Sequence, residues 1–199
     1  MRASSKIGKR LEKQMRALYL AGEYKELLTR ISDEQVEALS PALLELKAAA
    51  EIGTGLTDEG LKTFLFLASL QKNNYVVYLN IASCFLQLGR FDRALEHLDK
   101  AQELEQDDPD IHLRYGEAWL GLNDLTKAIL HFESAISKNK SHPGYWSCLG
   151  KAQLKKGDLE NSIISQKMAI ELAPMDPNIL NDAGVCFLEG GRLTMALDV

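Results

Sequence analysis

The sequence predicts an all-α protein, a solenoid of stacked antiparallel helical hairpins, and three observations carry this prediction. Small residues recur with a period of 34 residues, turn signals recur in phase with them, and large apolar residues recur between them at helical spacing. A period of about 34 residues is the length of one helix–turn–helix unit, so each period is expected to encode one hairpin.

The small residues form three columns that share this period. They are Ala82, Gly116, Gly150 and Gly184, then Ala94, Ala128, Ser162 and Ala196, then Ala101, Ala135 and Ala169. Small side chains at such places let two helices approach closely, while large residues fill the remaining volume. Tyr78, Ile81 and Phe85 are separated by three and four positions, which places them on one helical face.

Turn signals lie inside each unit and at its start. Gly89, Asn123, Gly157 and Gly191 stand between the two helices, and Pro109, Pro143 and Pro177 open units. Gly and Asn accept the left-handed conformation that ends a helix, and the first helical turn does not need the amide donor that Pro lacks.

These signals place the units along the chain. Repeats are predicted at 75–108, 109–142 and 143–176, a degenerate repeat at 41–74, a basic helix with a degenerate hairpin at 1–40, and a partial repeat at 177–199. The partial repeat ends within a helix, so we expect Phe187, Leu193 and Leu197 to be partly exposed or covered by a neighbouring molecule. The exposed C-terminal end is then a candidate surface for self-association.

Two segments carry a family resemblance. They are Gly116-Glu117-Ala118-Trp119 with Ala128, Phe132 and Ala135, and Trp146-Ser147-Cys148-Leu149-Gly150 with Ala169 and Pro174. They resemble the pattern of the tetratricopeptide repeat (TPR), strongly over 75–199 and more weakly upstream. The resemblance implies a right-handed α-solenoid that acts as a protein interaction scaffold rather than as an enzyme.

Polar residues interrupt the pattern in two repeats. Lys47 and Glu51 replace apolar residues in the second unit, and Gln153, Ser162 and Gln166 do so in the fifth. Buried polar groups need hydrogen-bond partners, so we expect the last three to pair with each other or to lie at a partly solvated seam.

Charge and composition exclude several classes of protein. Residues 1–16 carry six Lys or Arg and one Glu, a net charge of +5, and the whole chain is −5, so the remainder is −10. An acidic body without a basic stripe argues against nucleic acid as a partner. No apolar run approaches the roughly 18 residues of a membrane span, and no secretory signal is expected. An odd number of cysteines without a CxxC motif favours a reducing, cytoplasmic location.

The sequence offers no motif for chemistry, so no enzyme activity, cofactor or metal is predicted. The histidines are scattered and are expected at the surface or at helix seams: His97, His112, His131 and His142. Cys84 and Cys186 stand where the pattern has Ala and are expected to be buried free thiols. Cys148 falls near the expected binding surface, where a reactive thiol is an alternative.

The resemblance also implies where a partner binds, because first helices line a concave groove in such arrays. The candidate peptide-binding residues are Asn80, Ser83, Asp110, Arg114, Glu117, Lys151, Asn178 and Asn181, and the same wall includes Ser147, Cys148 and Asp182. Their amides can grip a peptide backbone and their cations can meet carboxylates. The expected function is an adaptor that binds a peptide or helix of a partner protein. Two alternatives stay open: the recruiting domain of a longer glycosyl- or sulfotransferase, and a chaperone of secretion substrates.

Overall fold

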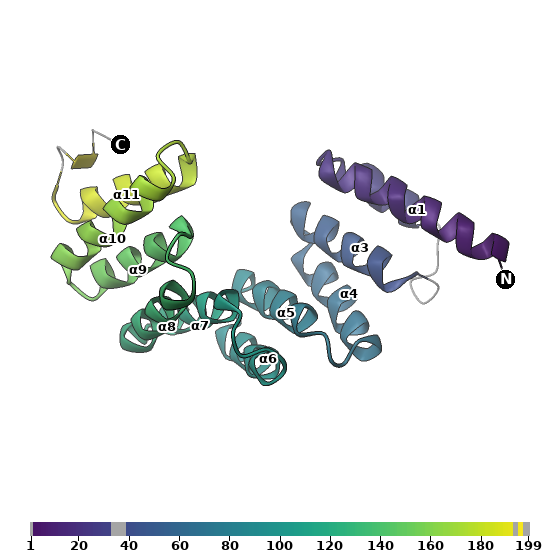
Figure 1. Cartoon of the computed structure of the whole chain (residues 1–199), viewed down its shortest axis with the longest axis horizontal. Coiled ribbons are helices and arrows are strands. Elements are labelled where there is room, and N and C mark those ends of the chain that lie inside the picture. Colours follow the sequence, from purple (N-terminus) through teal and green to yellow (C-terminus); the bar gives the residue numbers. More distant parts are fainter. Residues whose placement is uncertain (1, 33–38, 193–194, 197–199) are drawn as a thin grey trace. The chain divides into compact units, whose positions relative to one another are not determined.

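The computed structural model of the chain describes residues 2–32, 39–192 and 195–196, with side chains described from residue 9 onward except at residue 32 (Figure 1). Within these residues no strand occurs, and the regular secondary structure is helical. The helices are α1 (Arg2–Leu20), α2 (Tyr24–Ser32), α3 (Pro41–Gly53), α4 (Thr57–Leu70), α5 (Tyr75–Gln87), α6 (Phe91–Leu104), α7 (Pro109–Gly121), α8 (Leu125–Lys138), α9 (Pro143–Lys155), α10 (Leu159–Leu172) and α11 (Pro177–Glu189). The all-α prediction is confirmed.

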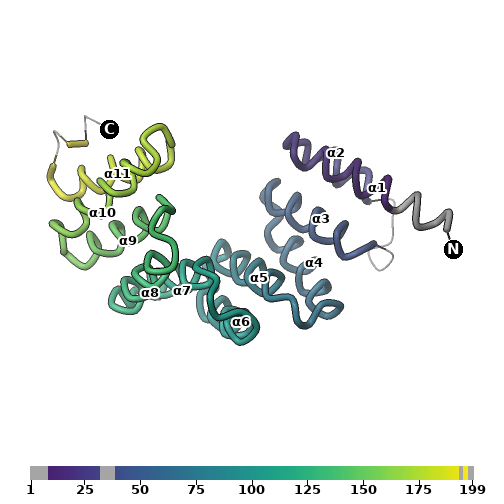
Figure 2. Tube along the Cα trace, in the orientation of Figure 1, coloured from purple at the N-terminus to yellow at the C-terminus, as the bar shows by residue number. Residues whose placement is uncertain are grey.

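The chain divides into two compact units, Met1–Leu104 and Glu105–Val199. In the first unit α3 packs against α4 and α5 against α6, while α1 and α2 both contact α3 (Figure 2). In the second unit α7 packs against α8 and α9 against α10, and α11 contacts both helices of the latter hairpin. Each unit is therefore a stack of helical hairpins.

Local signals in the sequence set the helix boundaries. Side-chain oxygens accept the backbone N–H groups of the first turn at Ser40, Asn74, Asp108, Asp124, Asp158 and Asp176. Such a cap contributes about 1 kcal/mol, because it satisfies a donor that has no partner within the helix. The predicted turn residue Asn123 has φ 63°, the left-handed conformation that Gly89 and Gly157 also adopt.

The column of small residues has a steric cause. A Cβ atom on Gly116 would lie 2.4 Å from Cε1 of Phe132, and one on Gly150 would lie 2.7 Å from Nε2 of Gln166. The first and second helices of these hairpins therefore touch through a bare backbone, and the large ring of Phe132 fills the adjoining space. Phe132, Tyr145 and Leu149 form the centre of the core of the second unit.

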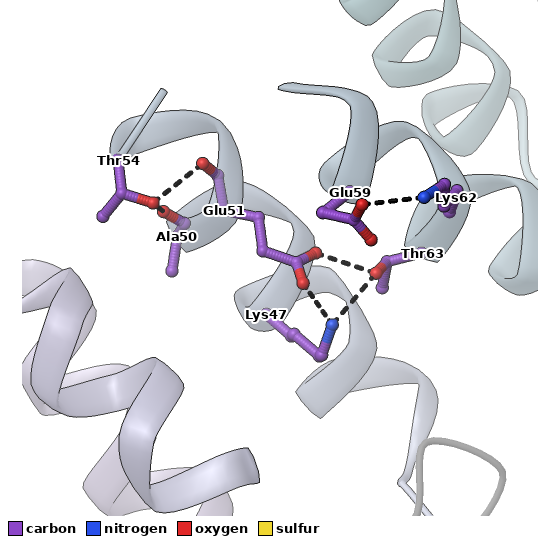
Figure 3. A network of polar contacts seen from close by, with 7 residues as sticks. All are labelled: Lys47, Ala50, Glu51, Thr54, Glu59, Lys62 and Thr63. Atoms are coloured by element: carbon purple, nitrogen blue, oxygen red, sulfur yellow. Dashed lines mark hydrogen bonds and ion pairs between the residues drawn. The ribbon is translucent and has the colours of Figure 1, made fainter. Parts of the chain in front are cut away.

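The core of the first unit includes a charged group. Lys47 on α3 forms an ion pair with Glu51 one turn later, and Thr63 on α4 donates a hydrogen bond of 2.8 Å to Glu51 Oε2 (Figure 3). The Lys47 ammonium also lies 3.2 Å from Thr63 Oγ1. Glu51 and Thr63 are buried, with 6% and 5% of their surface exposed. Lys47 and Glu51, the two residues that depart from the repeat pattern, thus neutralise each other's charge.

The polar residues of the fifth unit are also buried, and their partners differ from those expected. Ser165 donates a hydrogen bond of 2.8 Å to Gln153 Oε1, and Gln166 Nε2 lies 3.2 Å from the carbonyl oxygen of Ser147 and 3.1 Å from Cys186 Sγ. The expectation that Gln153, Ser162 and Gln166 pair with each other or lie at a partly solvated seam is therefore wrong, because all three are buried and the two glutamines bond to other residues on neighbouring helices.

The expected exposure of Phe187 is also wrong. Only 2% of its surface is accessible, because α11 packs against α9 and α10 and turns this ring inward. Leu193 and Leu197 lie outside the described residues. Self-association through an exposed C-terminal face loses the support that Phe187 was expected to give.

Candidate functional site

The predicted site residues fall on both units. Asn80 and Ser83 lie on α5 of the first unit and are half-buried, and Ser83 donates its hydroxyl to the Leu79 carbonyl at 3.0 Å. The other six lie on the first helices of the second unit. Asp110, Arg114 and Glu117 are on α7, Lys151 is on α9, and Asn178 and Asn181 are on α11.

Asp182 links α9 to α11. Its Oδ2 atom lies 2.6 Å from Lys151 Nζ and accepts a hydrogen bond of 2.9 Å from Ser147 Oγ. Ser147 is buried, whereas Lys151 and Asp182 keep 39% and 28% of their side-chain surface exposed. The buried Ser147 hydroxyl therefore holds Asp182 on its protein side, and the Lys151–Asp182 ion pair is partly exposed to solvent.

Arg114 and Glu117 form a second pair on α7, with Nη1 and Oε2 2.8 Å apart. About a third of each side chain is exposed. The Nε atom of Arg114 is buried and has no hydrogen-bond partner among the described residues. Because a guanidinium has five donors, this side chain keeps unused capacity for an acceptor.

Tyr145 ties α9 to α7 through a hydrogen bond of 2.7 Å from its hydroxyl to Asp110 Oδ1. Burial, and then this hydrogen bond to Asp110, raise the pKa of Tyr145. The phenol therefore stays protonated and holds the exposed Asp110 carboxylate in place.

Cys148 lies among these charged groups on α9. Burial, and then the Glu117 carboxylate, raise the pKa of Cys148 to about 12. The reactive form of cysteine is the thiolate, which is scarce at neutral pH when the pKa is so high. Burial therefore works against the alternative of a reactive thiol, and Cys84, Cys148 and Cys186 are all free.

Taken together, these contacts define a surface on the first helices of the second unit, made of Asp110, Arg114, Glu117, Lys151 and Asp182, which we call the α7–α9–α11 surface. Asn178 and Asn181 are exposed on α11 of the same unit. The charged groups are held by internal contacts in three places, which favours binding of a ligand by a preformed surface rather than bond-making chemistry.

Sequence reasoning missed a second group of polar residues, on α1. Lys9, Lys13 and Arg16 line an open pocket of about 340 Å³ together with Glu12 and, on α3, Ala42 and Leu46. A signal was present in the charge of residues 1–16, which carry six Lys or Arg and one Glu. The degenerate pattern there concealed it.

Three of the four histidines pack inside hairpins, and His142 is exposed at the start of α9. His97 is buried between Tyr78 and Phe85, with ring centroids 6.3 and 5.4 Å away. The Nδ1 atoms of His112 and His131 lie 3.3 Å apart across α7 and α8. No group of three or more His, Cys, Asp or Glu able to hold a metal ion occurs in the described part of the chain. Nor does any described helix combine the length and apolarity needed to cross a bilayer.

Comparisons with known proteins agree with this architecture. The family model described as tetratricopeptide repeat matches residues 79–145. No curated protein matches the sequence. The solved structure of TTC0263, a thermophilic TPR protein of Thermus thermophilus, is similar with a TM-score of 0.78 and 21% identity over 91% of this chain and 99% of that one.

Two further structures show the same fold. One is the APC/C hetero-tetramer Cut9-Hcn1, with a TM-score of 0.80 and 19% identity over 96% of this chain and 40% of that chain. The other is MamA, residues 41 to the end, from Desulfovibrio magneticus RS-1, with a TM-score of 0.64 and 19% identity over 79% of this chain and 89% of that one. The predicted solenoid is confirmed.

Proposed function

We propose that this chain, which is a tetratricopeptide-repeat protein, binds a peptide segment or helix of a partner protein on its α7–α9–α11 surface. Proteins of this family generally serve as interaction scaffolds and not as catalysts. The structural relative Cut9 was solved as a hetero-tetramer with Hcn1, so the fold does assemble with other proteins.

The observation that carries the proposal is the state of Arg114. About a third of its side chain is exposed, Glu117 orients its guanidinium, and its buried Nε donor has no partner among the described residues. A ligand acceptor can reach the exposed part of the guanidinium, and a hydrogen bond to a charged group contributes about 1.5–3 kcal/mol.

Preorganisation is the second support. Lys151 is held by Asp182, and Asp110 by Tyr145, so these side chains lose little conformational freedom when a ligand arrives. Asn178 and Asn181 on α11 add exposed amides, which can donate to and accept from a peptide backbone. We expect the ligand to place a carboxylate or a backbone carbonyl at Arg114.

The identity of the partner decides among the finer roles. An adaptor, the recruiting part of a longer transferase and a chaperone for secretion substrates would each use such a surface. We favour the adaptor, working in the cytoplasm, because three free cysteines suit a reducing compartment. Neither nucleic acid nor a membrane is proposed as its partner.

The test uses a partner isolated with the tagged chain from native lysate and then purified. We expect Arg114→Gln to weaken its binding by about tenfold in calorimetric titration, since the loss of one charge-assisted hydrogen bond is worth about 1.4 kcal/mol or more. The matched control is Lys167→Gln, which removes one charge from an exposed place on α10. Equal affinities for both variants would place the contact elsewhere.

A further inference from the structure

Three cations of the first unit face one pocket. Lys9, Lys13 and Arg16 on α1 line it, and Ala42 and Leu46 on α3 supply apolar contact area. Spacings of four and three place the cations on one face of the helix. We call this hollow, with Glu12 included, the α1–α3 pocket.

The cations are exposed, and no described carboxylate forms an ion pair with any of them. Like charges three and four residues apart on a helix repel each other and destabilise it. Glu12, which could offset Arg16 four residues later, accepts a hydrogen bond of 2.7 Å from Ser40 Oγ instead. An anionic ligand would relieve this repulsion.

We propose that the α1–α3 pocket binds an acidic peptide segment of a partner protein. Carboxylates of the segment pair with Lys9, Lys13 and Arg16, and an apolar side chain of the segment contacts Ala42 and Leu46. The second carboxylate oxygen of Glu12 accepts a backbone N–H, a donor that every peptide segment offers. This site shares no residue with the α7–α9–α11 surface and does not depend on it.

The composition of the pocket favours a peptide over nucleic acid. A phosphodiester backbone has no N–H for Glu12 to bind, so this carboxylate would only repel it. The half-buried Ala42 and Leu46 give contact area to an apolar side chain, which phosphate lacks. The remainder of the chain carries a net charge of −10 after the +5 of residues 1–16, which opposes the wide phosphate contact that nucleic-acid binding needs.

The experiment titrates the full chain into a dye-labelled peptide, acetyl-Glu-Glu-Leu-Glu-Glu-Leu-Glu-Glu-amide, and follows fluorescence anisotropy at low and at physiological salt. The same titration with every Glu replaced by Gln measures how far binding depends on the charge of the peptide. With both Leu replaced by Ser it measures how far binding depends on contact with Ala42 and Leu46. A labelled DNA duplex and vesicles containing phosphatidylserine provide the two anionic competitors.

We expect Lys13→Glu to weaken peptide binding by about tenfold or more, because it removes one charge-assisted contact and adds a repulsive one. Lys25→Glu makes the same change of charge at an exposed place on α2, outside the pocket, and should leave affinity within about twofold. Arg114→Gln should have no effect, so failure of the α7–α9–α11 surface and failure of this pocket give different results.

Four results would overturn the proposal. They are no binding of the acidic peptide, equal losses for Lys13→Glu and Lys25→Glu, equal binding of the Gln peptide, and preference for the duplex or the vesicles. Circular dichroism of each variant confirms that the helices are intact, as expected for exposed substitutions.

Discussion

Two hairpins of this protein have polar residues at the same two places of the repeat. The hydrogen-bonding groups of these residues find their partners in different ways. In α3–α4 the pair is Glu51 with Thr63, and in α9–α10 it is Gln153 with Ser165. In each case a hydroxyl on the second helix donates to an acceptor on the first at 2.8 Å. The difference is charge, because Glu51 also requires Lys47.

The aromatic hairpin α5–α6 shows what else these places accept. There Phe85 and His97 stack with ring centroids 5.4 Å apart. The repeat therefore specifies that the two helices touch at these places, and leaves open whether rings, neutral polar groups or an ion pair make the contact. The energetic consequences differ, because desolvation of a charge costs more than desolvation of an amide.

The largest expected effect comes from breaking the ion pair. Glu51→Leu leaves the Lys47 ammonium in a place where only 18% of its side chain is exposed. We expect a loss of about 3–5 kcal/mol in the free energy of unfolding, because an uncompensated buried charge remains. Urea titration followed by circular dichroism measures it.

The double variant Lys47→Leu/Glu51→Leu is the control for this prediction. It gives these two places the apolar character that Ile81 and Phe85 have in the α5–α6 hairpin, and such replacements of buried ion pairs are often neutral or stabilising by about 1–4 kcal/mol. A double variant as unstable as the single one would show that the lost volume or shape, and not the orphaned charge, causes the effect.

A smaller effect is expected in the neutral hairpin. Ser165→Ala removes the donor to Gln153 Oε1 and leaves a buried amide oxygen unsatisfied, which costs about 1–3 kcal/mol. Adding Gln153→Leu should recover most of this loss, because both polar partners are then gone. If Ser165→Ala costs as much as Glu51→Leu under the same urea titration, the distinction between charged and neutral pairs fails.

The α7–α8 hairpin adds a dependence on pH that the Gln153–Ser165 pair lacks. Burial lowers the pKa of His112 and of His131 below the ordinary value of 6.5; the charge of Lys138 adds to the effect on His112, and the charge of His112 adds to the effect on His131. A lowered pKa in the folded state favours the neutral ring, so the stabilisation is complete above about pH 6.5 and is lost as pH falls through the folded-state values.

We therefore expect the melting temperature to fall as the pH is lowered below about 6.5, and the fall to be shallower in the variant His131→Phe. Phe keeps the stacking contact with Tyr115, whose centroid lies 4.8 Å from that of His131, while it removes a titrating group. If the melting temperatures of the wild type and the variant fall equally between about pH 7.5 and 5, this account is contradicted.

Sequence reasoning reached the fold because its signals are local. Gly116 stands where a Cβ would collide with Phe132, and Asn123 stands where φ is positive, so periodicity and turn chemistry suffice to find both. The link from Lys151 to Asp182 depends on side-chain rotamers of two helices separated in sequence, which a repeat pattern does not encode.

The pocket on α1 and the burial of Phe187 escaped prediction for related reasons. Lys9 and Lys13 belong to a hairpin whose pattern is degenerate, so their places on the first helix had no register to support them. The partial last repeat predicts exposure of Phe187, whereas α11 packs against α9 and α10 and buries this ring. For Phe187 the period was right, and the direction of the side chain was not available from it.

The smallest expected effect lies beside the largest, in the same hairpin. Glu59 and Lys62 form an ion pair of 2.7 Å on α4, close to Thr63 (Figure 3). The hydrogen bond and charge of Lys62 lower the pKa of Glu59, and those of Glu59 raise the pKa of Lys62. Both directions favour the paired state between the two titrations, yet 70% and 53% of the side chains of Lys62 and Glu59 are exposed, so water and salt screen the pair. We expect Lys62→Gln to leave the urea midpoint unchanged at physiological salt, where Glu51→Leu shifts it strongly. A clear shift for Lys62→Gln that persists in high salt would mean that this pair supports the buried Lys47–Glu51–Thr63 cluster, and that burial alone does not separate the two ion pairs.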